Sequence, residues 1–404
     1  MEYLTLGHPP FQGLAPYQIG ELFGSLPTPA YVIDQARLEQ NGQVLSALAQ
    51  RTGCHILLAQ KAFSNYDFYP LLSQYLAGTE ASGLYEARLG FEEMGGKEVH
   101  VFCAGYREDE FGELLRYADH IVFNSIHQLK TLGPRAKAAG KSVGLRINPQ
   151  CSTQEGHAIY DPCAPGSRMG VTREVWNAQM DAHTLELLDG LHFHTLCEQN
   201  ADDLATTLEA VEENFGDVLP GMKWLNMGGG HHITRPDYQM DTLEGCIRHA
   251  QDTWGVEVYL EPGEAVALNA GYLVSRVVDL VENAGVHIAI LDASAACHMP
   301  DVLEMPYQPP ILHAVAQPGG AHTYRLAGPT CLAGDVVGDY SFAQPLKRGD
   351  LVVFGDMAIY TTCKNNTFNG MPLPDIWAME DGALAPLTRF GYQDFKMRLG
   401  SPRL

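Results

Sequence analysis

The chain has 404 residues, 46% of them hydrophobic and 18% charged, so it can bury a sizeable core and exceeds a typical single domain. The 26 basic and 48 acidic residues give a formal net charge of −22, which argues against nucleic acid and anionic membranes as partners. There is no signal-peptide pattern, no apolar run of about twenty residues and no CxxC pair among the nine cysteines, so we expect a cytoplasmic protein with reduced thiols.

Short apolar or β-branched runs recur along the first two thirds of the chain. Segments with helical spacing of apolar residues, such as "YEARLGFEEMG" and "ADDLATTLEAVEENFG", separate these runs. Strand and helix alternating in this way imply parallel pairing, so we predict an α/β fold with a (β/α)8 TIM barrel over residues 27–269. The eight predicted strands are 54–61, 78–83, 99–105, 120–125, 143–149, 190–195, 224–230 and 258–263.

The last third of the chain has a different texture. Segments such as "VHIAILDAS" and "GDLVVFGD" are rich in β-branched residues and are interrupted by Gly, Pro and Asp, with no regular helical spacers. We therefore predict a second, all-β domain (a β-sandwich or β-barrel) over residues 270–404, with residues 1–26 packed onto it. The segment "PTPAYVID" (27–34) is expected to lead into the barrel.

Polar residues gather at the carboxyl ends of the predicted barrel strands. In (β/α)8 barrels this edge carries the active site. Few polar residues fall at the beginnings of the same runs, which would not be the case if they were scattered by chance. The residues are Lys61, Glu80, Asn124, Arg146, His194, the run Gly228-Gly229-Gly230, and Glu261.

Lys61 ends the apolar run "LLAQK". A buried lysine loses hydration, which lowers its pKa and favours the neutral amine that attacks a carbonyl to form a Schiff base. The alternative is a lysine whose ammonium group reaches solvent from the end of the strand.

Three further motifs follow later strands. In "MGGG", the backbone N–H groups of Gly229 and Gly230 can turn towards an anion such as a phosphate, although a tight turn explains the glycines equally well. In "LEPGE", Glu261 can hold a proton on a ring nitrogen. "HFHT" places His192 and His194 on one face of a strand; a metal site would need a third ligand that the sequence does not clearly supply, whereas a flat ring can stack on an aromatic cofactor.

Together, a lysine, a stacking imidazole, a glycine turn and a carboxylate, each after a different strand, fit pyridoxal phosphate. With "FHT" (193–195), "EPG" (261–263), "GPTC" (328–331) and "IYTTCKNNTFNG" (359–370), the chain resembles the fold-type III (alanine-racemase-like) pyridoxal-phosphate decarboxylases over nearly its whole length. Within that family, "LLAQKAFSN", "EASGLYEA" and "EPGE" look most like the carboxynorspermidine decarboxylases.

The resemblance implies a homodimer with shared active sites, in which "GPTC" of one subunit completes the barrel site of the other. It implies the following roles: Lys61 bonds to the cofactor aldehyde, His194 stacks on the ring, Gly229, Gly230 and Tyr360 hold the phosphate, Glu261 pairs with the pyridine nitrogen, Cys331 donates a proton, and Asp335 approaches the distal part of the substrate.

Two positions depart from the family. Glu264 stands where ornithine and diaminopimelate decarboxylases carry Arg after "EPG", and Leu332 stands where the ornithine enzymes carry Asp.

The expected substrate is a small cationic carboxylated polyamine, carboxynorspermidine or carboxyspermidine, decarboxylated to norspermidine or spermidine. Its ammonium groups need paired carboxylates, and Asp301 and Glu304, three residues apart, would share a helix face; the alternative is that Asp301 caps a helix and Glu304 is solvated. Other interpretations are a diaminopimelate- or ornithine-type decarboxylase, an amino-acid racemase, a non-catalytic pyridoxal-phosphate carrier and a zinc hydrolase.

Overall fold

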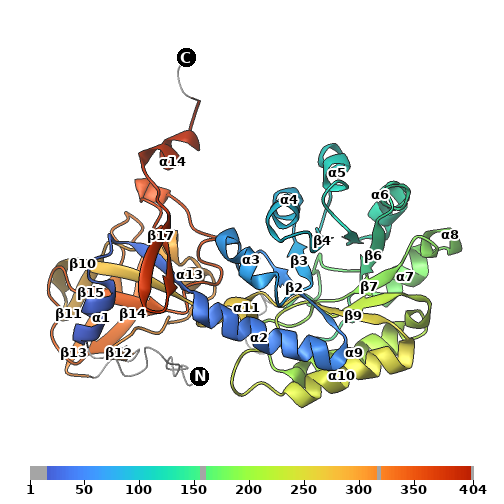
Figure 1. The fold of residues 1–404 in the computed structure, drawn as a ribbon, viewed down its shortest axis with the longest axis horizontal. Helices are drawn as coiled ribbons and strands as arrows, with labels where there is room; N and C mark the ends of the chain where they lie inside the picture. The colour runs from blue at the N-terminus through green and yellow to red at the C-terminus, as the bar shows by residue number, and fades with distance from the viewer. Residues whose placement is uncertain (1–15, 155–160, 316–319, 402–404) are drawn as a thin grey trace. The chain divides into compact units, whose positions relative to one another are not determined.

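The computed structural model describes residues 16–154, 161–315 and 320–401 and divides the chain into two compact units (Figure 1). The barrel unit is Glu39–Val266, and the sheet unit combines Met1–Leu38 with Ala267–Leu404. Within the described ranges, no helix is long and apolar enough to cross a lipid bilayer.

Eight parallel strands close into a barrel, as the sequence predicts. Each strand pairs with its neighbours along the chain, and the last pairs with the first. The strands are β2 (His55–Ala59), β3 (Gly78–Ala81), β4 (Glu98–Phe102), β5 (His120–Phe123), β6 (Ser142–Arg146), β7 (Gly190–His192), β8 (Trp224–Asn226) and β9 (Glu257–Leu260).

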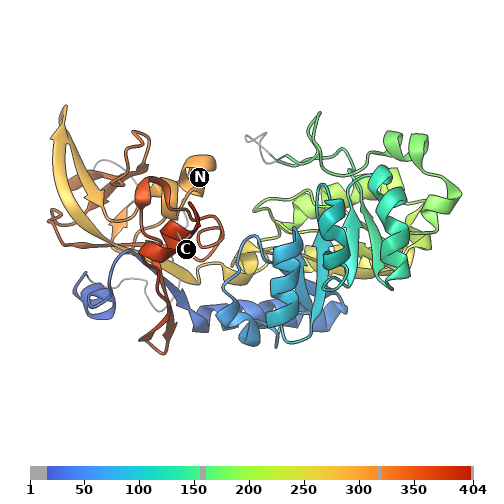
Figure 2. The same ribbon diagram turned by 90° about the horizontal axis from the view of Figure 1, so that it is seen from above.

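Helices surround these strands on the outside of the barrel unit (Figures 1 and 2). Local sequence sets their ends: the Asn200 side chain accepts a hydrogen bond from the N–H of Ala201 where α9 begins, and Gly255 takes a left-handed conformation (φ 69°) where α10 ends. The helices are α2 (Gln35–Thr52), α3 (Tyr69–Leu72), α4 (Leu84–Glu93), α5 (Glu108–Leu114), α6 (Ile126–Ala138), α7 (Arg173–Gln179), α8 (Ala182–Leu185), α9 (Ala201–Phe215), α10 (Met240–Trp254) and α11 (Glu264–Ala267).

Large side chains fill the inside of the barrel. Trp224 belongs to a buried cluster there, and its indole lies directly against the backbone of Gly144 and Gly190. A Cβ atom would lie 2.3 Å from the indole at Gly144 and 2.1 Å from it at Gly190, so neither position tolerates a larger residue unless the indole moves. The barrel interior is therefore a packed core, and the polar groups at its carboxyl end sit on a rigid floor.

The sheet unit is built on nine strands, mostly antiparallel, in the order β12-β14-β13-β11-β10-β1-β16-β17, with β15 also paired to β10. Two pairs, β1 with β16 and β11 with β13, are parallel. The strands are β1 (Ala30–Asp34), β10 (Gly271–Asn283), β11 (Val286–Leu291), β12 (Ala314–Val315), β13 (His322–Ala327), β14 (Val336–Phe342), β15 (Leu351–Gly355), β16 (Asp375–Glu380) and β17 (Ala383–Thr388); the helices are α1 (Pro16–Phe23), α12 (Ala295–His298), α13 (Asp301–Glu304) and α14 (Tyr392–Met397).

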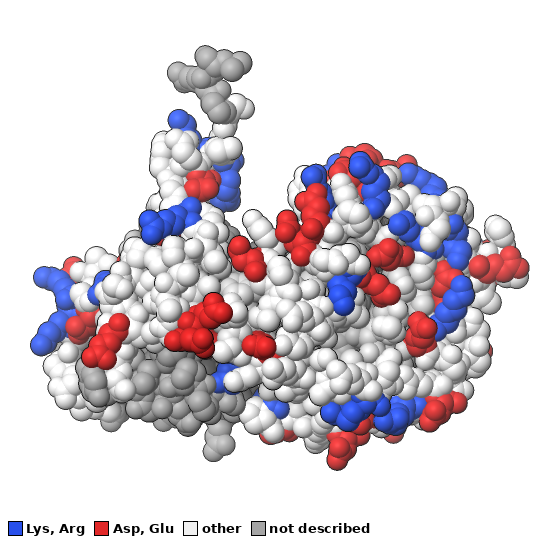
Figure 3. Space-filling view, in the orientation of Figure 1, with Lys and Arg blue, Asp and Glu red and all other residues white. Residues whose placement is uncertain are grey.

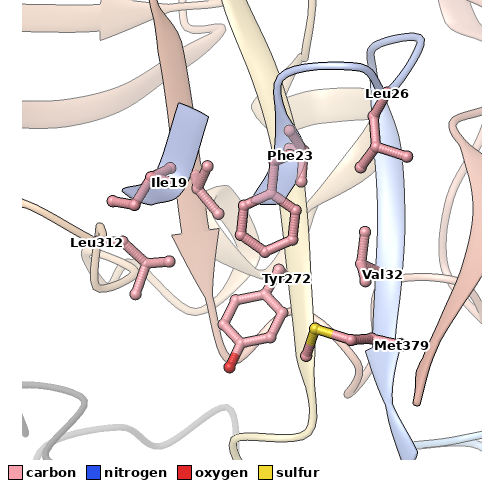
Figure 4. Close-up of a cluster of buried hydrophobic side chains, with 9 residues drawn as sticks. Ile19, Phe23, Leu26, Val32, Tyr272, Leu312 and Met379 are labelled. Carbon is pink, nitrogen blue, oxygen red and sulfur yellow. The ribbon is translucent and has the colours of Figure 1, made fainter. Parts of the chain in front are cut away.

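A cluster of buried apolar side chains forms a core of the sheet unit (Figure 4). Helix α1 contributes Ile19 and Phe23, and the Phe23 ring lies 5.8 Å from the ring of Tyr272 on β10. Val32 of β1 and Met379 of β16 belong to the same cluster, together with Leu26 and Leu312. Residues 16–26 thus pack on the sheet, whereas residues 1–15, also expected there, lie outside the described residues.

The boundary between the two units differs from the predicted one. Residues 27–38 were expected in the barrel, but β1 pairs in parallel with β16 and antiparallel with β10, so this strand belongs to the sheet unit. The chain passes into the barrel unit within α2. The strand is buried along its whole length, and a continuous apolar run fits either a parallel barrel or a covered sheet.

Acidic and basic side chains are interspersed over the visible face of the barrel unit (Figure 3). On that face the formal charge of −22 does not form one continuous acidic patch.

Candidate active site

Lys61 lies in the turn that follows β2. The turn is fixed by its neighbour Gln60, whose backbone N–H donates to the carbonyl of Glu80 (3.1 Å) and whose side chain donates to the carbonyl of Glu86 (2.9 Å). Tyr69 in turn donates to the Gln60 side chain (3.0 Å). The Lys61 side chain is half-buried rather than fully buried, which corrects the sequence expectation.

Two neighbouring strands hold the carboxylate of Glu261, directly after β9. Nε2 of His192 on β7 lies 3.0 Å from Oε2, and the side-chain amide of Asn226 on β8 donates to Oε1 (2.6 Å). Asn226 also accepts a hydrogen bond from the N–H of Gly228 (2.8 Å). Each oxygen of the carboxylate therefore has a partner and a fixed direction.

The Glu261 carboxylate is buried, yet it is held in the charged form. Burial opposes ionisation, but the interaction with His192 and the positive charge of Lys61 outweigh it and lower the pKa of Glu261. A fixed anion at this place favours a proton on any ring nitrogen that it contacts.

Glu80 and Arg146, for which no role was predicted, lie at the same end of the barrel, and both are buried. Burial raises the pKa of Glu80 to about 8, although the nearby Lys61 charge opposes that shift. Among the described residues, Oε2 of Glu80 has no hydrogen-bond partner. Arg146 is buried against the ring of Phe102 (4.6 Å) and donates to the carbonyl of His194 (3.0 Å). The signal available in the sequence was their position at strand ends.

The glycine turn after β8 leaves no room for side chains. A Cβ atom on Gly229 would lie 2.3 Å from the carbonyl oxygen of Glu261, and one on Gly230 would lie 2.1 Å from the carbonyl oxygen of Leu196. Gly228 and Gly230 also have φ values of 72° and 81°, in the left-handed region. The three glycines thus let backbone groups approach closely, as an anion site requires.

His194 lies beside this turn. Its Nδ1 accepts a hydrogen bond from the N–H of Gly229 (2.7 Å), so the predicted phosphate contact of Gly229 requires that bond to break. Burial, together with the charges of Lys61 and Arg146, holds the pKa of His194 well below its usual range. The imidazole is therefore neutral, and Nδ1 is its acceptor.

These groups fit pyridoxal phosphate. The cofactor needs an amine for its aldehyde, an anion for its pyridinium nitrogen, a flat neutral surface for its ring and exposed backbone at its phosphate. Lys61, Glu261, His194 and the glycine turn supply these groups from four strands at the same edge of one barrel. The sheet unit carries the other predicted site residues, Tyr360, Cys331, Asp335, Asp301 and Glu304.

The "GPTC" loop of the sheet unit is held from two sides. The N–H of Cys331 donates to the side chain of Asn369 (2.7 Å), and Thr330 donates to the carboxylate of Asp335 (2.6 Å). Asp335 is only 2% exposed and also accepts hydrogen bonds from Ser294 (2.9 Å). These hydrogen bonds hold the Asp335 carboxylate against the loop that carries Cys331. Cys331 itself is exposed.

Asp301 and Glu304 form α13, so their predicted common helix face is present. The structure adds a partner that the sequence did not indicate: the ammonium group of Lys364 donates to both carboxylates. Tyr360 precedes Lys364 in the same loop and has a positive φ of 53°, which is uncommon for a residue other than glycine.

Glu264, which departs from the family pattern, pairs with Nε2 of His232 at 2.9 Å. Both side chains are nearly buried. A histidine–carboxylate pair thus stands where ornithine and diaminopimelate decarboxylases carry Arg.

Comparisons with known proteins agree with this chemistry. A family model described as "Pyridoxal-dependent decarboxylase, C-terminal sheet domain" matches residues 30–358. The carboxynorspermidine/carboxyspermidine decarboxylase of Campylobacter jejuni is 39% identical over 93% of this chain and 99% of its own, and the carboxyaminopropylagmatine decarboxylase of Synechocystis is 41% identical over 93% and 96%.

The solved structure of the Campylobacter jejuni carboxynorspermidine decarboxylase with norspermidine has a TM-score of 0.84 at 38% identity, covering 92% of this chain and all of that one (100%). The diaminopimelate decarboxylase of Helicobacter pylori with L-lysine, at 18% identity, shares the fold with a TM-score of 0.80, covering 94% and 98%. With a family model matching most of its length and relatives at about 40% identity over nearly all of it, this chain belongs to the pyridoxal-dependent decarboxylases.

Proposed function

We propose that this protein removes the α-carboxylate of a carboxylated triamine, carboxynorspermidine or carboxyspermidine, as CO2, and releases norspermidine or spermidine. The observation that carries the proposal is the charged carboxylate of Glu261, fixed by His192 (3.0 Å) at the barrel edge where Lys61 also lies. The choice of substrate is supported by the relative from Campylobacter jejuni and by its structure with norspermidine.

Pyridoxal phosphate, when bound, bonds to an amine through its aldehyde, and its protonated ring accepts the electron pair left behind when CO2 departs. Lys61 is the amine that would hold the cofactor through its aldehyde. Glu261 keeps the proton on the ring nitrogen throughout. Neutral His194 provides the stacking surface, and Gly230 and Tyr360 hold the phosphate.

The departing carboxylate leaves a carbon that must receive a proton. We assign this proton to the thiol of Cys331, acting as a general acid from the partner subunit of a homodimer. This assignment is supported by the exposure of Cys331 and by the hydrogen bond from its backbone N–H to Asn369 (2.7 Å), which fixes the loop. The exposed side chains of Leu332 and Phe368, 44% and 48% exposed, are consistent with a surface that a second subunit covers.

The distal ammonium groups of the substrate would bind near α13. Asp301 and Glu304 carry two negative charges, and Lys364 neutralises one of them in the free chain. The cluster therefore keeps a net negative charge, and a substrate ammonium group competes with Lys364 for the same oxygens.

With nine free cysteines and no bridge among them, the cytoplasm remains the proposed compartment.

A second candidate substrate is carboxyaminopropylagmatine, because the Synechocystis relative named for it is 41% identical over 93% of this chain. It ends in a planar guanidinium group instead of a compact ammonium group, and the two groups present their N–H donors in different geometries. Carboxylates on α13 can accept from either group, so the ratio of kcat/KM values decides between them.

The test is a decarboxylation assay on purified, cofactor-loaded protein. Carboxynorspermidine, carboxyspermidine, carboxyaminopropylagmatine, diaminopimelate and ornithine would each be supplied, with CO2 release and product mass as readouts. We expect the highest kcat/KM with a carboxylated triamine and none with the K61A variant. Equal or faster turnover of diaminopimelate or ornithine would overturn the substrate assignment. Release of an epimerised acid without CO2 would indicate a racemase, and cofactor binding without any turnover would indicate a carrier.

A further inference from the structure

A second group of polar side chains lies at the opposite, amino-terminal end of the barrel. Glu98 and His100 alternate along β4, and His120 begins β5 directly opposite His100 in the parallel register. Their rings stack at 3.8 Å with 18° between the planes. One nitrogen or oxygen atom from each of Glu98, His100 and His120 lies within 4.8 Å of the other two.

Two of the imidazole nitrogens in this group are unsatisfied. Nδ1 of His100 and Nδ1 of His120 are both buried, and neither has a hydrogen-bond partner among the residues that the structure describes. His100 is only 1% exposed. An unpaired polar atom in a protein interior costs free energy, and two such atoms side by side require an explanation.

Ring packing alone explains only part of the arrangement. The ring of Tyr259 lies 4.6 Å from that of His100, and the ring of Trp224 lies 5.3 Å from that of His120, so these residues close the floor of the barrel. Nε2 of His100 lies 3.2 Å from a carboxylate oxygen of Glu98, but Nδ1 of His100 and Nδ1 of His120 have no partner among the described residues. Imidazoles beside a carboxylate point to a ligand for their lone pairs.

We propose that Glu98, His100 and His120 bind a divalent transition-metal ion of the Zn2+, Co2+ or Ni2+ class. Two neutral imidazoles and one carboxylate are a ligand set that these ions accept, with water in the remaining position. Metal–ligand bonds of about 2.0–2.2 Å bring ligand atoms to distances inside the 4.8 Å limit that these three atoms already satisfy, and the side chains adjust to that geometry on binding. The Glu98 side chain, 40% exposed, provides the route from solvent.

The site is structural rather than catalytic. Glu98 and His120 begin β4 and β5 and His100 lies in the middle of β4, whereas Lys61 and Glu261 follow the ends of β2 and β9. A bound ion would cross-link two neighbouring strands at the base of the barrel and stabilise the folded state by mass action. This inference does not depend on the proposed substrate.

The experiment uses tag-free, cofactor-loaded enzyme that has been treated with a chelator and then dialysed. Zn2+ is titrated by calorimetry, and the melting temperature is measured with and without the ion. We expect one ion per chain and a higher Tm with Zn2+. Co2+ should give visible d–d bands without the strong charge-transfer bands of thiolate ligands, which separates this site from the cysteines.

Two variants locate the ion. H120F keeps an aromatic ring in the stack, and E98Q changes a partly exposed side chain, so both should fold. Each should weaken Zn2+ binding by about 100-fold or more and remove the gain in Tm. The matched control is H249A, because His249 forms an exposed pair with Glu212 (2.9 Å) but belongs to neither three-ligand group among the described residues.

Three results would overturn the proposal. The first is the absence of binding to the wild-type enzyme, and the second is binding that H120F and E98Q leave unchanged. The third is binding that is lost in H232A, which would move the ion to the separate group of Glu198, His232 and Glu264. Decarboxylase activity is recorded in parallel; its loss in K61A with unchanged Zn2+ binding would separate this inference from the proposed function.

Discussion

Oε2 of Glu261 lies 3.0 Å from Nε2 of His192, and this pair joins the ends of two strands that are far apart in the chain. Asn226, on the strand between them, holds the other oxygen (2.6 Å). The result is an anion whose direction is set by three strands of one rigid barrel. Such preorganisation lets a single carboxylate hold a proton on a cofactor ring without moving during the reaction.

Replacing Glu261 with Gln tests the charge of this group without changing its shape. The amide still fits between His192 and Asn226 but cannot hold a proton on a ring nitrogen. We expect kcat to fall by about 100-fold or more, with the bound cofactor retained. Steady-state CO2 release and the absorbance of the bound cofactor measure both. A kcat within a factor of about three of wild type would contradict this role.

Asn226→Asp tests whether the neighbour tunes that charge. A second carboxylate 2.6 Å from Oε1 would repel the Glu261 anion and raise its pKa. The acid limb of the kcat/KM profile should then move to higher pH. A residue that is only structural would lower kcat/KM at every pH without moving the limb, so the pH profile distinguishes the two outcomes.

Glu80 links stability to pH. Its folded-state pKa of about 8 lies above the ordinary 4.5, so between these values the folded chain holds a proton that the unfolded chain has lost. The free energy of unfolding therefore decreases as pH rises through this window, until Glu80 also loses its proton in the folded chain at about pH 8. The E80Q variant lacks this titration, so its stability advantage over wild type should grow from pH 5 to pH 8, reaching the order of a few kcal/mol.

Denaturant unfolding at several pH values measures this difference. E213Q, at an exposed position on α9, is the control and should follow the wild-type curve. A constant difference between E80Q and wild type across the window would mean that Glu80 is ionised in the folded chain.

Gly229→Ala tests the glycine turn. The new methyl group would lie 2.3 Å from the carbonyl oxygen of Glu261, so the turn must open. We expect the cofactor Kd to rise by tenfold or more and Tm to fall, since a backbone clash of this kind costs about 1–3 kcal/mol. Gly245→Ala is the matched control. It lies within α10 with no atom within 4 Å of its Cβ position and should be neutral or slightly stabilising.

The barrel was predictable because its signals are local. Each strand is a short apolar run next to an amphipathic helix, and all eight predicted runs overlap observed strands. The predicted ends were too late: β7 ends at His192 and β8 at Asn226, whereas the polar residues that follow already belong to loops. The residues at this edge were therefore found, but their strand assignment was not correct.

What the sequence could not give depends on pairing across long separations. Strand β1 is as apolar as a barrel strand, and only its partners β10 and β16, more than 200 residues away, place it in the sheet unit. The hydrogen bonds of Asp335 with Ser294 and Thr330 are likewise invisible to periodicity. The position of Asp335 in the motif pointed to this residue, but these contacts with the loop were not predicted.

The ion trio of Lys364, Asp301 and Glu304 gives the sharpest test of substrate recognition, because two changes to it should act in opposite directions. The K364M variant removes the ammonium group that competes for both carboxylates, so we expect KM for carboxynorspermidine to fall several-fold while kcat changes little. The D301N/E304Q double variant removes the charge that attracts an ammonium group, and KM should rise about tenfold or more, since one lost charge-assisted hydrogen bond is worth roughly 1.5–3 kcal/mol.

The melting temperature is the control measurement for both variants, because Lys364 also fixes α13 through these hydrogen bonds. If the trio were only structural, both variants would lower Tm and both would impair turnover. Opposite shifts in KM at a similar Tm cannot arise from a loosened helix, because loosening has the same sign in both. They require that the substrate and Lys364 compete for the same carboxylate oxygens, which makes Lys364 a determinant of how many positive charges the bound polyamine carries.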